Sequence, residues 1–364
     1  MPTVNLSKKQ AHFWETIYTR GLGEFYFKNK IDFHNLVHFP YSDSISLTPD
    51  LSKHQDRSLV GIGGRKDSIV TVELLKRANK QITGFILNPH PIQENISKLL
   101  EIDSISMSRV LDPQLFELNK RQDAYNGHVP ISTIYAFTAI LGAVLYDYRY
   151  IIVSNEKSAN YGNVEYLGET VNHQWSKSEE FEKLMQDYVK SFISQDIVYF
   201  SLLRPFYEVK IVELFSHYEK YFSTFSSCNT NFKLNSVSTK LWCGQCAKCA
   251  FAFSLLAAFL PKDNVVKIFG KNLYGDNNLL ELYRELLGIK DIKPFDCVGT
   301  PDEVKLSFIK AYKKGEYHNE PIMKLFETDV LPGITNEENL ESNLMGASNF
   351  GGIPQSFEET ILNL

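Results

Sequence analysis

From residue 58 to about residue 203, short runs rich in β-branched residues alternate with longer stretches of helical periodicity. Strands that alternate with helices at this interval usually pair in parallel, because each helix carries the chain back to the start of the next strand. We therefore predict an α/β fold with a parallel five-stranded sheet flanked by helices. The predicted strands are 58–62, 82–88, 105–110, 150–155 and 197–203, and the main predicted helices are 67–78, 131–146 and 179–193.

Changes in composition divide the chain into four parts. The predicted parts are 1–57, an N-terminal helical or irregular segment; 58–220, the sheet domain; 221–262, a cysteine-bearing segment; and 263–364, a helical C-terminal region. In the first part we predict one helix, around Lys9 to Tyr18. The acidic tail after Leu325 lacks Lys and Arg. It is predicted either to be partly disordered or to fold back through its apolar residues, which are Phe357, Ile361 and Leu364.

The net charge of −5 excludes a general electrostatic attraction to nucleic acid or membranes. Residues 1–9 lack the apolar run of a secretory signal, so a cytoplasmic location is expected. The uncharged stretch 129–146 contains Pro130 and Thr133, and we interpret it as a buried core helix, not a membrane span. The expected partner is a small-molecule substrate, with no nucleic acid and no membrane, and a homodimer remains open.

The loop Gly61-Ile62-Gly63-Gly64-Arg65-Lys66-Asp67-Ser68 joins the first predicted strand to the first helix of the sheet. Glycines let backbone N–H groups approach an anion, and the following helix adds its partial positive charge. Lys66 can neutralise a phosphate, Ser68 can donate to it, and Asp67 can hold Mg²⁺ or cap the helix. The spacing fits neither a Walker A loop nor a dinucleotide-binding fingerprint. A tight turn before a capped helix is the structural alternative.

This loop resembles the PP-loop of the ATP pyrophosphatases, written S-G-G-x-D-S, when it is aligned on Asp67-Ser68. Arg65 replaces the second glycine, and its Cβ would crowd a phosphate or resist a positive φ. The resemblance implies an ATP pyrophosphatase domain that binds ATP and Mg²⁺ and releases AMP and pyrophosphate. The implied binding residues in the loop are Gly61, Gly63, Gly64, Arg65, Lys66, Asp67 and Ser68.

Four cysteines offer a second site: Cys228, Cys243, Cys246 and Cys249. Four thiolates at Cys–x₂–Cys spacing close a tetrahedral structural zinc site. An iron–sulfur cluster is the rival, but Ala250 and Phe251 stand where a ferredoxin-type run would need a further Cys-Pro. Reduced thiols are the remaining alternative. We expect Zn²⁺ in a folding role, holding the following helix against the sheet. Such a set after a PP-loop domain also resembles 7-cyano-7-deazaguanine synthase.

Further segments resemble one PP-loop family, the UDP-N-acetylmuramoyl-L-alanyl-L-glutamate epimerases of peptidoglycan synthesis. They are His128-Val129-Pro130-Ile131-Ser132, Asn155-Glu156-Lys157-Ser158-Ala159-Asn160, Val171-Asn172-His173-Gln174-Trp175-Ser176-Lys177-Ser178, Leu203-Arg204-Pro205, Ser227-Cys228-Asn229 and Pro294-Phe295-Asp296-Cys297-Val298-Gly299-Thr300. Each string is weakly specific, and their order along one chain carries the resemblance, which covers about residues 40 to 315. The resemblance implies inversion of the terminal L-glutamate of UDP-MurNAc-L-Ala-L-Glu, with adenylation of its carboxylate. Adenylation removes the negative charge that opposes loss of the Cα proton, so a positioned side chain can take it.

Candidate catalytic residues are Lys66, Asp67, Lys177, His173, Cys297 and Arg204, and Ser132 and Glu156 join the nucleotide-binding set. Arg204 ends a strand and suits a carboxylate or phosphate clamp. Cys297 or His173 can exchange a proton. The structural alternatives are a buried inert cysteine, solvated loop residues and, for Ser132, a helix N-cap.

Two other functions fit parts of the pattern. A PP-loop ligase or thiolase would join ammonia or sulfur to another activated substrate. A degenerate nucleotide-binding or zinc-stabilised interaction module would bind without turnover, and Arg65 in the glycine loop is the feature that favours it.

Overall fold

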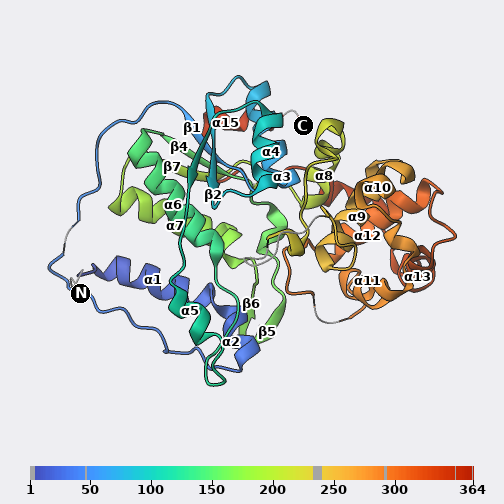
Figure 1. Cartoon of the computed structure of the whole chain (residues 1–364), viewed down its shortest axis with the longest axis horizontal. Helices are drawn as coiled ribbons and strands as arrows, with labels where there is room; N and C mark the ends of the chain where they lie inside the picture. The colour runs from blue at the N-terminus through green and yellow to red at the C-terminus, as the bar shows by residue number, and fades with distance from the viewer. Residues whose placement is uncertain (1–4, 46, 233–239, 291–292, 349, 363) are drawn as a thin grey trace.

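The computed structural model describes residues 5–45, 47–232, 240–290, 293–348, 350–362 and 364. At its centre lies a parallel five-stranded sheet with the order β3-β2-β1-β4-β7 (Figure 1). Its strands are β1 (Ser58–Gly61), β2 (Ile82–Leu87), β3 (Ser104–Met107), β4 (Tyr150–Val153) and β7 (Val198–Ser201). A separate antiparallel pair consists of β5 (Val164–Tyr166) and β6 (Glu169–Val171). The predicted sheet is therefore confirmed, with shorter strands than expected.

The α-helices of the N-terminal two thirds are α1 (Lys8–Arg20), α2 (Gly23–Asn29), α3 (Lys66–Arg77), α4 (Pro91–Leu100), α5 (Pro113–Leu118), α6 (Ile131–Tyr146), α7 (Glu179–Phe192) and α8 (Glu208–Ser216). The remainder are α9 (Ala247–Phe259), α10 (Lys262–Phe269), α11 (Leu280–Leu286), α12 (Pro301–Lys313), α13 (Pro321–Asp329), α14 (Glu337–Met345) and α15 (Gln355–Glu358). The three main predicted helices of the sheet domain match α3, α6 and α7 to within one residue at each end.

Successive strand residues face opposite sides of the sheet, and the apolar core divides accordingly. Leu59 and Ile151 pack with residues of α1, α6 and α7 on one face. Val60 and Ile152 pack with residues of α3, α4, α8 and α9 on the other. Because both faces are covered, successive residues of the inner strands β1 and β4 are apolar, as expected for a buried parallel sheet, whereas the edge strand β3 alternates serine with apolar residues.

Helix α9 connects the sheet domain to the C-terminal helices. Every residue from Ala247 to Ala258 is buried, so this helix is enclosed on all sides. Its apolar side chains belong to the same core as those of α3 and α8. Figure 1 shows α9 to α13 gathered in one lobe beside α8. The cysteine segment, which leads into α9, therefore lies where this lobe joins the sheet.

The C-terminal tail folds back onto the sheet domain. Phe357 and Ile361 are buried, and the Phe357 ring lies 4.8 Å from the ring centre of Tyr150 and 5.1 Å from that of Phe200. The fold-back alternative is thus confirmed for these two tail residues, whereas Leu364 stays 36% exposed.

Helix α6 differs from the expected core helix. Its alanine side, which includes Ala136 and Ala143, packs on the sheet, but Leu141 and Leu145 on the other side are 52% and 63% exposed. The predicted buried core helix is therefore confirmed on its sheet-facing side only. Within the described residues, no helix combines the length and apolar character that crossing a bilayer requires.

Candidate active site

The glycine loop turns sharply at one residue, Gly64. Its φ of +71° is left-handed, and an added Cβ would approach the Ile92 side chain at 2.9 Å. Arg65 is the N-cap of α3 with φ −111° and ψ 165°, an extended conformation that any residue adopts. The expected conflict between Arg65 and a positive φ therefore does not arise. At Gly63, by contrast, an added Cβ would meet nothing within 4 Å.

These two glycines give a matched pair of variants. Gly64→Ala should lower the free energy of unfolding by about 1–3 kcal/mol, because the left-handed backbone and the Ile92 contact both oppose a Cβ. Gly63→Ala should leave unfolding unchanged but weaken ATP binding, if a phosphate occupies the open space. Chemical denaturation and nucleotide titration measure the two effects separately. Equal ATP affinity in Gly63→Ala and the unsubstituted protein would contradict this use of the loop.

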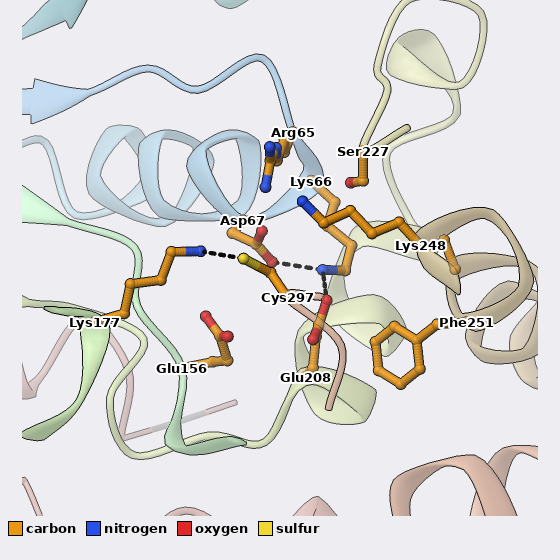
Figure 2. Close-up of a pocket in the computed structure, with 11 residues that line it drawn as sticks. Arg65, Lys66, Asp67, Glu156, Lys177, Glu208, Ser227, Lys248, Phe251 and Cys297 are labelled. Carbon is orange, nitrogen blue, oxygen red and sulfur yellow. Dashed lines mark hydrogen bonds and ion pairs between the residues drawn. The ribbon is translucent and has the colours of Figure 1, made fainter. Parts of the chain in front are cut away.

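A charged pocket opens beside this loop at the carboxyl ends of β1, β4 and β7 (Figure 2). Loops after parallel strands meet at this edge, which is where such sheets bind ligands. The residues that line the pocket are Arg65, Lys66, Asp67, Glu156, Lys177, Glu208, Ser227, Lys248, Phe251, Ala252 and Cys297. The pocket thus combines the glycine loop with four further segments that the sequence resemblance had singled out separately.

Lys66 lies on the pocket floor and is only 3% exposed. Its ammonium group donates to Asp67 Oδ1 at 2.7 Å and to the carboxylate of Glu208. Burial lowers the pKa of Lys66, but the two carboxylates raise it above its usual value. Lys66 therefore stays charged, and a phosphate entering the pocket would compete with Glu208 for it.

Glu156 adds a third carboxylate to the pocket. Burial raises the pKa of this side chain, and the nearby Asp67 raises it further, against the opposing effects of Lys177 and Lys66. A site that crowds carboxylates in this way gains from a bound cation, because the cation offsets their mutual repulsion. Asp67 and Glu156 consequently have the oxygen chemistry that suits Mg²⁺.

On the opposite wall, the Lys177 ammonium group donates to the Cys297 sulfur at 3.5 Å. Figure 2 shows Lys177 and Lys248 reaching toward Cys297 from opposite sides in this view. Burial raises the pKa of Cys297, yet Lys177, Lys248 and His173 together hold it well below its ordinary value. These positively charged neighbours favour the thiolate form of Cys297.

Arg204 lies behind the pocket, and its guanidinium is already engaged. It forms a buried ion pair with Glu182 at 2.6 Å and donates to the backbone carbonyls of Glu156 and Lys177 at 2.8 and 2.7 Å. Its charge is matched within the protein, which favours a positioning role over the expected clamp on a ligand. Through these bonds Arg204 fixes the two loop segments that carry Glu156 and Lys177.

The remaining predicted residues lie outside the set that lines the pocket. Ser68 donates to the Arg65 carbonyl at 3.0 Å, within the glycine loop that also includes Gly61, Gly63 and Gly64. Ser132 is the second residue of α6, and Pro130 is the N-cap, so the N-cap alternative for Ser132 was wrong. His173 contacts Cys297 from behind.

The four cysteines of the predicted metal site converge. All their sulfur atoms lie within 4.8 Å of one another, with Cys246–Cys249 at 3.5 Å, Cys243–Cys249 at 3.7 Å and Cys228–Cys246 at 4.0 Å. Four sulfurs about 2.3 Å from a tetrahedral zinc ion would be about 3.8 Å apart. Backbone N–H groups also point at two of the sulfurs, from Cys243 to Cys228 Sγ and from Gln245 to Cys243 Sγ. The donor set therefore fits Zn²⁺.

Several pocket residues were not predicted. Lys248 lies inside the Cys-Ala-Lys-Cys run, which was interpreted only as part of a metal site. Phe251 follows on the same helix. Glu208 begins α8 and had no motif to mark it. Glu24, which lies outside the pocket lining but pairs with His173, comes from α2, in a segment without a recognised pattern. Only the position of Glu208 just beyond a predicted strand gave a usable signal.

The fold and pocket define an α/β protein with a charged pocket at the carboxyl edge of a parallel sheet, where such sheets bind ligands, beside a four-cysteine segment. Family models assign it more narrowly: the MurL N-terminal domain matches residues 1–202, and the MurL C-terminal domain matches residues 224–341. The chain belongs to the MurL family.

Curated relatives agree with this assignment. A protein of Xanthomonas oryzae pv. oryzae is 34% identical over 98% of this chain and 79% of its own length. Relatives from Micromonospora sp. and Salinispora tropica are 34% and 35% identical, over 90% and 84% of this chain and 73% and 67% of their own lengths. All three are named UDP-N-acetyl-alpha-D-muramoyl-L-alanyl-L-glutamate epimerase.

Proposed function

We propose that this protein is an ATP-dependent epimerase. It adenylates the terminal L-glutamate carboxylate of UDP-MurNAc-L-Ala-L-Glu, releases pyrophosphate and then AMP, and inverts the residue to D-glutamate for peptidoglycan synthesis. The observation that carries the proposal is the shared pocket: the glycine-loop residues Lys66 and Asp67 and the thiolate of Cys297 face one space. Activation of a carboxylate and proton transfer at the adjacent carbon need such closely placed groups.

In this proposal the glycine loop binds the ATP phosphates. The open space at Gly63 admits a phosphate oxygen, and the N-terminus of α3 favours its negative charge. Lys66 then exchanges its Glu208 partner for the departing pyrophosphate. Asp67 and Glu156 would hold Mg²⁺, which when bound would supply charge compensation for the phosphates and for these two carboxylates.

The carboxylate oxygen of the substrate attacks the α-phosphorus, and the bond to the pyrophosphate breaks. The resulting mixed anhydride has a neutral acyl group, so its carbonyl can accept electron density when the Cα proton leaves. Lys177 and Lys248 lie where they can stabilise the enolate oxygen. Return of a proton to the other face, followed by hydrolysis of the anhydride, yields the D-glutamyl product and AMP.

Incubation of the purified protein with ATP, Mg²⁺ and UDP-MurNAc-L-Ala-L-Glu should release equal amounts of AMP and pyrophosphate and convert L-glutamate to D-glutamate. Chiral analysis after acid hydrolysis measures the inversion, and UDP-MurNAc-L-Ala serves as the control that lacks the glutamyl residue to be inverted. Absence of AMP, or formation of an amide or thioacid, would reject the epimerase in favour of a non-catalytic module or a ligase.

A further inference from the structure

A hydrogen-bonded chain of three side chains runs from the N-terminal helix α2 to the pocket. Glu24, on α2, accepts from the imidazole of His173, and His173 in turn bonds to the sulfur of Cys297. Cys297 is the one cysteine outside the four-cysteine cluster and is partly accessible in the pocket. These three residues are widely separated in sequence, so only the fold brings them together.

The charges of these three hydrogen-bonded side chains alternate in sign. Burial lowers the pKa of His173, but its hydrogen bonds with Cys297 and Glu24 raise it to about 9. Burial raises the pKa of Glu24, yet His173 and Lys28 lower it to about 2. His173 is therefore an imidazolium between a carboxylate and a thiolate, and Lys177 faces the same sulfur from the other side.

We propose that Cys297 is the catalytic residue that exchanges the Cα proton on one face of the activated glutamate, and that Glu24 and His173 are positioning residues that keep its sulfur ionised and aimed into the pocket. This assignment rests on the proposed function, since it concerns the adenylated substrate. To the proposed function it adds the identity of one proton-transfer group, Cys297, and a positioning role for Glu24 of the N-terminal segment.

The step is balanced within the pocket. The Cα–H bond breaks, an S–H bond forms on Cys297, and the electron pair of the broken bond moves to the carbonyl of the mixed anhydride, giving an enolate. In the reverse direction the S–H proton returns to Cα on the same face. No oxidant or further reactant is needed, because the sulfur starts as a thiolate.

Three further hydrogen bonds hold the backbone around these side chains in place. Asn163 accepts from the His173 N–H at 2.8 Å and donates to the Pro294 carbonyl at 2.9 Å, which joins the His173 loop to the Cys297 loop. Gln174 donates to the Val298 carbonyl at 3.3 Å. The segments that carry His173 and Cys297 are thus joined by hydrogen bonds both before and after Cys297. Such bonds hold the two side chains in a fixed relative position, as a catalytic pair requires.

A metal site is the competing interpretation of part of this cluster. His128 lies 3.6 Å from the carboxylate of Glu24, and the ligand atoms of Glu24, His128 and His173 lie within 4.8 Å of one another. However, Glu24 is already paired with both Lys28 and His173, and His173 is matched by Cys297. Internal pairing accounts for the cluster without a cation.

The first test uses Cys297→Ser in D₂O with ATP and UDP-MurNAc-L-Ala-L-Glu or its D-Glu epimer. We expect epimerisation to fall by about 10²–10⁴-fold, deuterium incorporation at Cα to be lost from at least one epimer, and single-turnover pyrophosphate release to persist. Undiminished deuterium incorporation from both epimers, or loss of pyrophosphate release in this variant alone, would overturn the assignment. Lack of AMP with the unsubstituted protein would instead reject the proposed function.

A second test follows the positioning residues. Iodoacetamide should alkylate Cys297 of the zinc-loaded protein well below pH 9, and peptide mass spectrometry distinguishes it from the other cysteines. In His173→Gln and Glu24→Gln, the pH at which the alkylation rate of Cys297 reaches half its maximum should rise by about one pH unit or more. The exposed control variant His12→Gln should leave this midpoint unchanged. An unmoved midpoint in folded His173→Gln would contradict the positioning role. The positioning role would also be contradicted if the unsubstituted protein bound a second zinc ion and the His128→Gln variant lost it.

Discussion

Substitution of Cys249 by serine is expected to abolish metal binding and to lower the free energy of unfolding by about 4 kcal/mol or more. The reason lies in its position. Cys249 is fully buried in the first turn of α9, and its sulfur lies within 3.7 Å of those of Cys243 and Cys246. Without the metal, three thiols would crowd an apolar core with no shared partner. Zinc content by atomic absorption and urea denaturation measure the two effects.

Cys297→Ser is the matched control, because Cys297 lies outside the four-cysteine cluster and should retain one zinc ion per chain. Treatment of the unsubstituted protein with a strong chelator should reproduce the instability of Cys249→Ser. A brown protein that contains iron and sulfide, or unchanged zinc in Cys249→Ser, would refute the zinc assignment.

The cysteine segment also affects the pocket. Lys248, between two of the metal-binding cysteines, is 7% exposed and lines the pocket, as does Phe251 one turn later on α9. The sequence pattern predicted a purely folding role for the metal. The geometry adds a consequence, since any loosening of the first turn of α9 would displace Lys248 from its place near Cys297.

Local patterns were sufficient to predict the sheet. Leu59 and Val60 are both apolar because helices cover both faces, and this run followed by glycines marked β1 and its loop. The helix predicted at 67–78 also appears as α3, and its apolar residues Ile69, Val70, Val72, Leu74 and Leu75 all face the core. These features depend on neighbours within one strand or one helical turn, which a sequence displays directly.

Long-range pairings could not be predicted in the same way. Glu24 meets His173 across 149 residues of sequence, and no local pattern had indicated α2. Arg204 looked like a ligand clamp because it follows a strand, but its buried partner Glu182 lies on another helix. A charged side chain at the carboxyl edge of a sheet can serve a ligand or the protein, and only its partner distinguishes the two.

Substitution of Lys66 by methionine should have two separable effects. Lys66 is 3% exposed and forms a buried ion pair with Glu208, so its loss leaves a buried carboxylate unpaired and should cost about 3–5 kcal/mol of stability. Pyrophosphate release should also fall by about 10²–10³-fold, because the leaving diphosphate loses its cation. Denaturation midpoints and single-turnover pyrophosphate assays measure these losses.

The double variant Lys66→Met/Glu208→Gln separates the two effects, because it removes both charges of the pair. Stability should recover by about 2 kcal/mol or more relative to Lys66→Met, since the buried carboxylate that was the partner of Lys66 is then replaced by a neutral amide. Pyrophosphate release should stay low, because neutral side chains cannot bind the leaving group. Recovery of activity along with stability would show that Lys66 serves the fold alone and that phosphate binds elsewhere.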